Sequence, residues 1–250
     1  ITQMLSYMLV IALLVWWRPT IAPALPRASW AERFSALRGM ADIGLLVVVV
    51  TGGIVVGWIT PSEAAAVGAA GAFLICLLRR RLTLATLHKA LAETLKTSGL
   101  IYLVIIGALV FAAFVSVTGL TDAVAQGIAG LGMGPIGTML LVAVFLLLVG
   151  SVLDGLALML LTTPILLPLV GDLGLSPIWF GIFLVRAMEI GFVHPPLGMN
   201  LYVIQGVAKD VPLMRVFKGV LPFLAADLVH LVLLVVFPVI AMGLSHWVGR

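Results

Sequence analysis

Prolines and glycines interrupt an apolar stretch at residues 191–200, which are Gly-Phe-Val-His-Pro-Pro-Leu-Gly-Met-Asn. Each proline lacks an amide hydrogen, so a carbonyl one turn earlier loses its helical donor, and the glycines allow an unwound backbone. Free carbonyls could coordinate a cation, whereas a simple kink at a membrane boundary would account for the same residues. The candidate ligand positions are Gly191, His194, Pro195, Pro196, Gly198 and Asn200.

Charged residues also occur inside apolar runs. Asp154 lies within the run 138–170, and a charged side chain at a bilayer centre costs about 2.5–3.5 kcal/mol. A cation or an aqueous cavity would offset that cost; alternatively, Asp154 caps a helix that begins near water. Arg186 and Glu189 are three residues apart, so they could form an ion pair on one helix face. The competing interpretation is that Arg186 contacts the carboxylate of a substrate.

Hydroxyl side chains accompany turn residues in two further segments. Ser116 and Thr118 precede Gly119, and their hydroxyls could bind a cation or bond back to the preceding turn. Thr60, Pro61 and Glu63 fit the N-cap, N1 and N3 positions of a capping box, which needs no ligand to explain it.

The remaining residues that could bind a metal or catalyse a reaction match no known motif. The four histidines and the single cysteine, Cys76, lack metal-ligand spacing. The sequence contains no HExxH, GxSxG or GxxxxGK[ST] motif. We therefore expect this chain to be no enzyme, to hold no resident metal or organic cofactor, and to hydrolyse no ATP.

The elements that position these residues follow from composition. Of the 250 residues 63% are hydrophobic and only 10% are charged, whereas a soluble domain carries roughly 25% charged residues. This balance excludes soluble, disordered and disulfide-rich classes and predicts an all-α polytopic membrane protein in contact with lipid. The net charge of +4 is interpreted as basic cytoplasmic loops rather than as a nucleic-acid surface.

Seven apolar runs are separated by polar or basic segments, at residues 4–17, 43–59, 64–78, 100–117, 138–170, 177–207 and 220–247. Between the third and fourth runs, an amphipathic segment that ends at Lys96 predicts a helix lying at the membrane interface. The basic loops 18–42, 79–96 and 207–219 would face the cytoplasm. The fourth run must then return to its own side as a re-entrant hairpin with its tip near residues 116–120, unless it crosses fully and a further span balances it.

Three ordered motifs resemble the large membrane subunit of TRAP (tripartite ATP-independent periplasmic) transporters, in its C-terminal portion. They are Gly-Gly-Ile-Val-Val-Gly-Trp-Ile-Thr-Pro-Ser-Glu at 52–63, Leu-Asp through Thr-Pro-Ile-Leu-Leu-Pro at 153–168, and Glu-Ile-Gly through Pro-Pro-Leu-Gly-Met-Asn-Leu at 189–201. Two positions depart from the family's usual pattern, since Ser62 and His194 stand where threonine is common.

The resemblance implies a permease subunit of a Na⁺-coupled secondary transporter in a bacterial or archaeal inner membrane. Such a transporter imports organic acids that a periplasmic binding protein delivers, and a small membrane subunit packs beside the large one. The alternative is a subunit of another secondary transporter or of a channel, without a binding protein. The chain begins Ile-Thr-Gln without an initiator methionine, and we expect it to be a fragment or a processed chain.

The resemblance also implies an elevator mechanism, in which broken helices and a hairpin of the second repeat hold substrate and Na⁺. Here the hairpin would be 98–131 and would face the break at 191–200, with Na⁺ between carbonyls of that break and residues 116–119. The chain would be one partial transmembrane domain, with a scaffold at 1–97, a transport region at 98–206 and a terminal segment and helix at 207–250.

Overall fold

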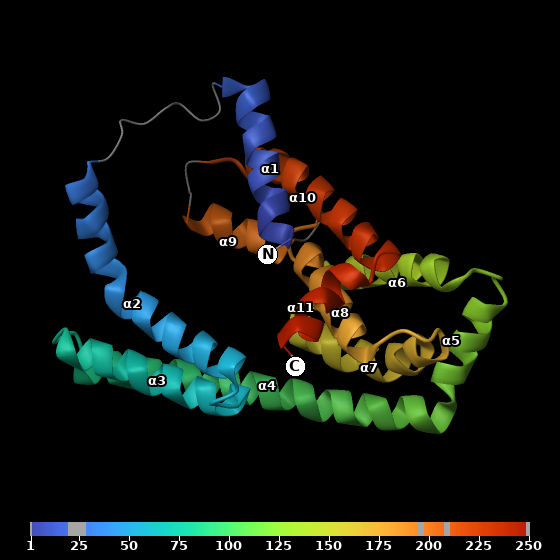
Figure 1. The fold of residues 1–250 in the computed structure, drawn as a ribbon. Helices are drawn as coiled ribbons and strands as arrows, with labels where there is room; N and C mark the ends of the chain where they lie inside the picture. Colours follow the sequence, from blue (N-terminus) through green and yellow to red (C-terminus); the bar gives the residue numbers. More distant parts are fainter. Residues whose placement is uncertain (1, 20–28, 195–197, 208–210, 249–250) are drawn as a thin grey trace. The chain divides into compact units, whose positions relative to one another are not determined.

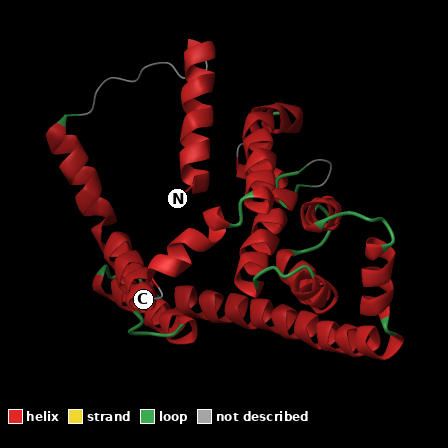
Figure 2. Ribbon diagram, turned by 45° about the vertical axis from the view of Figure 1, so that its right-hand side comes forward, coloured by secondary structure: helices red, strands yellow, loops and turns green. Residues whose placement is uncertain are grey.

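Helices supply all the regular secondary structure in the described part of the chain, which confirms the all-α prediction (Figure 2). The structure is a computed structural model that describes residues 2–19, 29–194, 198–207 and 211–248. Its helices are α1 Thr2–Trp17, α2 Trp30–Val56, α3 Pro61–Leu78, α4 Leu84–Thr118, α5 Leu120–Ala129, α6 Pro135–Gly150, α7 Gly155–Asp172, α8 Pro177–Gly191, α9 Met199–Val207, α10 Leu213–Val236 and α11 Val239–Val248 (Figure 1).

Five of these helices are long and apolar enough to cross a membrane: α2, α3, α4, α7 and α10. The apolar helices α1 and α6 are shorter. The composition-based prediction of a polytopic membrane protein agrees with this finding, since a span needs about 20 predominantly apolar residues.

The chain divides into two compact units, which are described separately. Unit 1 comprises Ile1–Ala22 and Gly99–Arg250, and unit 2 is Pro23–Ser98. The boundary falls within α4. The assignment of scaffold and transport roles to segments of the chain stays a prediction.

Unit 2 is built on the packing of α2 against α3. The Thr60 amide donates to Glu63 Oε2 at 2.7 Å, and the Glu63 amide donates to Thr60 Oγ1 at 3.3 Å. This geometry confirms the capping box, with Pro61 in the first turn of α3. An exposed ion pair of 2.7 Å joins Arg79 at the end of α3 to Asp42 of α2.

The separate interfacial helix predicted up to Lys96 is wrong, because the segment continues into the fourth apolar run as the 35-residue helix α4. The joining residues Thr97, Ser98 and Gly99 include no proline, and a single glycine costs a helix only about 1 kcal/mol. The chain turns at Gly119, whose φ of 65° is left-handed, and α5 follows. A turn therefore lies where the hairpin tip was predicted, and its re-entrant path stays a prediction.

Unit 1 has its core around α8, which packs against α6, α7 and α10 (Figure 1). Trp179 and Phe183 of α8 stack with ring centroids 5.3 Å apart, and both are almost fully buried. The Trp179 indole donates to the carbonyl of Leu234 in α10 at 3.0 Å. This core fixes the ends of α6, α7 and α8 relative to one another.

Candidate functional site

The C-terminal ends of α6 and α8 touch at two glycines. A Cβ atom built on Gly191 would lie 2.8 Å from the carbonyl carbon of Gly150 and 3.0 Å from its oxygen. Because real Cβ atoms do not approach a backbone so closely, only glycine fits at position 191. We call residues 150–155 together with 188–194 the break junction.

The break junction gathers carbonyl groups. The last carbonyls of a helix have no partner within it, and they carry the partial negative charge of the helix dipole. Ser151 Oγ donates to the Leu148 carbonyl at 2.7 Å, and the His194 amide donates to that of Ile190 at 2.8 Å. No donor among the described residues reaches the Gly150 carbonyl oxygen. The Gly150 carbonyl, unpaired in the described part of the chain, lies beside the C-terminal end of α8 and therefore offers an oxygen ligand that favours a cation.

Asp154 borders the break junction as the N-cap of α7. Its carboxylate accepts a hydrogen bond from the Leu156 amide at 3.0 Å, and the side chain is exposed. The capping interpretation is confirmed. A Cβ atom built on the next residue, Gly155, would meet the Met188 sulfur and the Phe192 ring, so the cap lies close to the end of α8. Binding of a cation by Asp154 stays a prediction.

The predicted break between α8 and α9 is present, because regular helix stops at Gly191 and resumes at Met199. The chain folds back on itself there: the Gly198 amide donates to the His194 carbonyl and the Asn200 amide to that of Phe192, each at 3.1 Å. His194 Nδ1 is buried and has no partner among the described residues. Pro195 and Pro196 lie outside the described residues.

The hydroxyl-bearing residues of the predicted hairpin tip are elsewhere in unit 1. Thr118 Oγ1 donates to the Phe114 carbonyl at 2.8 Å, as the structural alternative anticipated, and Ser116 is exposed. No hydrogen bond among the described residues joins segment 116–119 to segment 191–200. Figure 1 shows the turn between α4 and α5 well apart from α9. The Na⁺ site predicted between these two segments therefore stays a prediction.

Arg186 forms the centre of a buried polar cluster. Its guanidinium donates to Glu189 Oε2 at 2.5 Å, which confirms the predicted ion pair, and to Asp227 Oδ1 of α10 at 3.0 Å. From α1, Tyr7 donates to Asp227 Oδ2 at 2.7 Å and Gln3 to Oδ1 at 3.1 Å. The cluster therefore ties α1, α8 and α10 together.

Sequence reasoning missed Asp227, although a signal was available. It is the only acidic residue after position 210 and lies inside the last apolar run, where an ionisable side chain needs a partner. With Arg186 it forms a pair in which both side chains are nearly inaccessible, at 8% and 6% exposure. Arg186 Nε has no partner among the described residues, so the guanidinium keeps one donor for another ligand.

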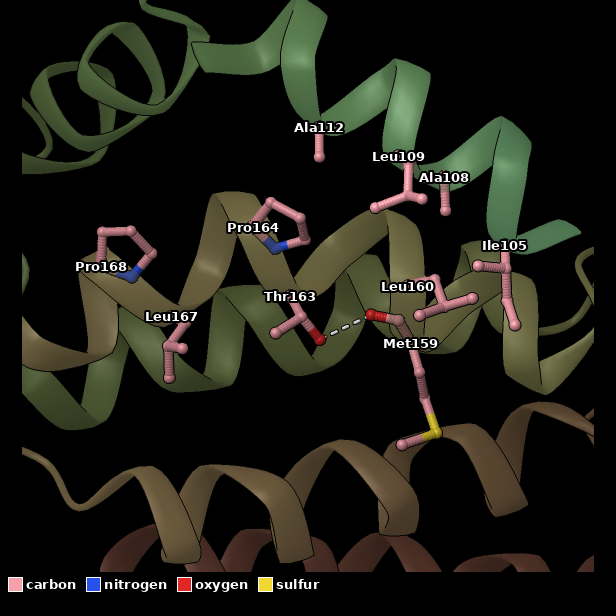
Figure 3. A pocket seen from close by; sticks show the side chains of 10 residues that line it. All are labelled: Ile105, Ala108, Leu109, Ala112, Met159, Leu160, Thr163, Pro164, Leu167 and Pro168. Carbon is pink, nitrogen blue, oxygen red and sulfur yellow. Dashed lines mark hydrogen bonds between the residues drawn. The ribbon is translucent and has the colours of Figure 1, made fainter.

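An apolar groove of about 450 Å³ separates α4 from α7 in unit 1. Figure 3 shows Ala112 of α4 directed toward Pro164 of α7, and Ala108 directed toward the part of α7 that holds Leu160. Thr163 Oγ1 bonds to the Met159 carbonyl at 2.5 Å, so the groove presents almost no free polar group. It is better suited to apolar packing than to a polar ligand.

Residues 2–240 match the family described as "Tripartite ATP-independent periplasmic transporter, DctM component". This chain belongs to the DctM family. The match confirms the resemblance drawn from the three motifs.

Three curated relatives are each named as a TRAP transporter large permease protein. The chain is 33% identical over 247 residues to the C4-dicarboxylate TRAP transporter large permease protein DctM of Pseudomonas aeruginosa, covering 98% of this chain and 58% of the relative. It is 36% identical to the sialic acid TRAP transporter large permease protein SiaM of Vibrio cholerae, covering 86% and 50%. It is 34% identical to the 2,3-diketo-L-gulonate TRAP transporter large permease protein YiaN of Escherichia coli, covering 95% and 56%.

These relatives are transporter permease proteins and not enzymes, in agreement with the expectation for this chain. The chain spans somewhat more than half the length of the curated relatives it matches most fully.

Proposed function

We propose that this chain is the ion- and substrate-handling part of a TRAP large permease subunit that imports an organic acid together with Na⁺. The observation that carries the proposal is the contact between Gly150 and Gly191. It joins the end of α8, which lies inside the third motif that resembles the family, to the end of α6, which lies just before the second.

The contact supports Na⁺ as the coupling ion. Secondary transporters coordinate Na⁺ with unwound carbonyls and helix C-terminal ends, and both occur at the break junction. Asp154 lies at the edge of the same junction and keeps one carboxylate oxygen free of described donors. Each Na⁺ that moves inward down the membrane potential releases roughly 2.3 kcal/mol per 100 mV. This free energy can drive accumulation of the substrate without ATP.

The relatives and the Arg186 cluster support an organic acid as substrate. The three relatives are named for C4-dicarboxylate, sialic acid and 2,3-diketo-L-gulonate, and each of these compounds carries a carboxylate. Arginine recognises carboxylates through paired donors. Arg186 is buried in contact with two protein carboxylates, so a substrate carboxylate would approach its remaining Nε donor or exchange with Glu189, the more exposed of the two.

The family supports two partners, a small membrane subunit and a periplasmic binding protein, and a location in the inner membrane of a bacterium or archaeon. It equally supports an elevator motion of the broken-helix region. These proposals concern the whole permease and not unit 1 alone.

The test is uptake of a radiolabelled C4-dicarboxylate, sialic acid or diketogulonate by the complete permease in proteoliposomes. We expect uptake that requires both an inward Na⁺ gradient and the binding protein. Uptake that persists without the binding protein would instead favour the alternative, another secondary transporter or a channel. Uptake that ignores Na⁺ would refute the assignment of the break junction as an ion site.

A further inference from the structure

A groove between α1 and α10 combines apolar walls with two cationic side chains. We call it the basic groove; it has a volume of about 470 Å³ and includes Ile11, Leu14, Arg18, Lys218, Gly219 and Phe223. The two helices run antiparallel, since Thr2 bonds to His230 and the Tyr7 ring contacts that of Phe223. Arg18 and Lys218 consequently lie at the same end of the groove.

That end has the features of a membrane interface. Trp16 and Trp17, at the end of α1, are 83% and 79% exposed, and tryptophans gather where lipid headgroups meet hydrocarbon. From Arg18, the groove continues past Leu14 to Ile11, two helical turns farther along an apolar face. The groove thus has a charged mouth and an apolar interior.

The charges at the mouth are not neutralised by the described part of the protein. Neither Arg18 nor Lys218 has an ion pair or a side-chain hydrogen bond among the described residues. α1 contains no acidic residue, and α10 contains none before Asp227. Two cations that line one apolar groove and have no ion pair among the described residues favour an anion with an apolar tail.

Two residues of α10 keep the slot open and polar at its mouth. A Cβ atom built on Gly219 would meet nothing within 4 Å, so the space beside it is unfilled. Pro222 lies inside α10 and has no amide hydrogen, so the carbonyl of Lys218 lacks its usual helical donor. A hydroxyl-bearing headgroup could donate to that carbonyl.

We propose that the basic groove binds one anionic phospholipid of the phosphatidylglycerol type. Its phosphate pairs with Arg18 and Lys218, a headgroup hydroxyl donates to the Lys218 carbonyl, and one acyl chain lies along Leu14, Ile11 and Phe223. This inference rests on the groove alone and does not depend on Na⁺ coupling or on the substrate.

The experiment uses the complete permease in nanodiscs of phosphatidylcholine with increasing phosphatidylglycerol, and native mass spectrometry counts the lipids retained after gentle release. We expect one phosphatidylglycerol to be retained by the wild type. Arg18→Gln with Lys218→Gln should weaken that retention about tenfold. Gly219→Leu should weaken it to a similar extent, although both charges remain, because leucine fills the slot.

The matched control is Arg81→Gln with Lys89→Gln, which removes two exposed charges from unit 2 and should leave retention unchanged. If this control lost as much lipid retention as the Arg18→Gln and Lys218→Gln variant, the loss would reflect net charge alone, and the proposed lipid site would be refuted. Retention that survives Gly219→Leu, or displacement of the lipid by glycerol 3-phosphate alone, would show that no acyl chain enters the groove. A protein segment seated there in the complete permease would also overturn the proposal.

Discussion

Unit 2 and unit 1 use similar apolar helices for different purposes. In unit 2 none of residues Gly39–Val56 in α2 is buried, and in α3 the buried share is 6%. In unit 1 the share is 33% in both α7 and α10. The α6–α7 and α8–α9 helix breaks and the buried ion pair all lie in unit 1. Irregular backbone and charge at membrane depth need surrounding protein, so burial, not hydrophobicity, separates the two regions.

The ion pairs of the two units provide the strongest test of this difference. Asp227→Asn should destabilise the complete permease by about 3 kcal/mol, because it leaves Arg186 short of a buried partner. Asp42→Asn, which breaks the exposed pair with Arg79, should cost less than about 1 kcal/mol. Unfolding by denaturant in mixed micelles measures both. Equal costs would contradict the contrast between the units.

The glycines offer a second comparison. Gly191→Ala should destabilise by about 1–3 kcal/mol, because its Cβ atom would collide with the Gly150 backbone. Gly44→Ala in α2 meets no atom within 4 Å and should stabilise the helix by about 0.5–1 kcal/mol. Melting temperatures of the purified permease give the signs. A stabilised Gly191→Ala variant would exclude the close contact of α6 and α8.

Asp154→Asn separates capping from ion binding. Asparagine caps helices as well as aspartate does, so stability and membrane insertion should stay unchanged. If the carboxylate also binds Na⁺, the Na⁺ concentration for half-maximal uptake should rise about tenfold, equivalent to roughly 1.4 kcal/mol. Normal Na⁺ dependence in proteoliposomes would leave Asp154 with its capping role alone.

The smallest effect is expected at the start of α2. Hydrogen bonds from the Ser29 amide and hydroxyl hold the pKa of Glu32 below its ordinary value near 4.5. Because the pKa of Glu32 is lowered in the folded state, ionised Glu32 stabilises the start of α2 at pH values above its unfolded-state pKa. This stabilisation is lost as the pH falls through the folded-state pKa. The protection of amides 30–33 against exchange, measured relative to the intrinsic rate at each pH, should therefore fall on acidification, and Glu32→Gln should abolish that dependence. If the pH dependence of amide protection persisted in Glu32→Gln, it would have to arise from another titratable group.

Local chemistry allowed much of the structure to be predicted. Capping at Thr60 and Asp154, the Arg186–Glu189 pair and the interruptions of the two long apolar runs all depend on residues within a few positions of one another. The helix class follows from composition. These features need no knowledge of how distant segments pack.

The remainder depends on distant contacts. Asp227 lies 41 positions from Arg186, and periodicity does not reveal which buried charges meet. The contact of Gly150 with Gly191 likewise follows from the packing of α6 on α8. The continuity of α4 was missed because its charged start was assigned a separate interfacial helix, although no helix-breaking residue separates the two parts.

The length of α4 has a consequence for the bilayer. At 1.5 Å per residue, its 35 residues extend roughly 52 Å, whereas a hydrocarbon layer is about 30 Å thick. If α4 stands along the membrane normal, it extends roughly four turns beyond the hydrocarbon layer. If it is strongly tilted, more of its length lies within the lipid. Only an orientation close to upright keeps the turns bearing Lys89, Glu93 and Lys96 at or beyond the headgroups. The charged start of α4 therefore limits how far the helix can tilt in the membrane.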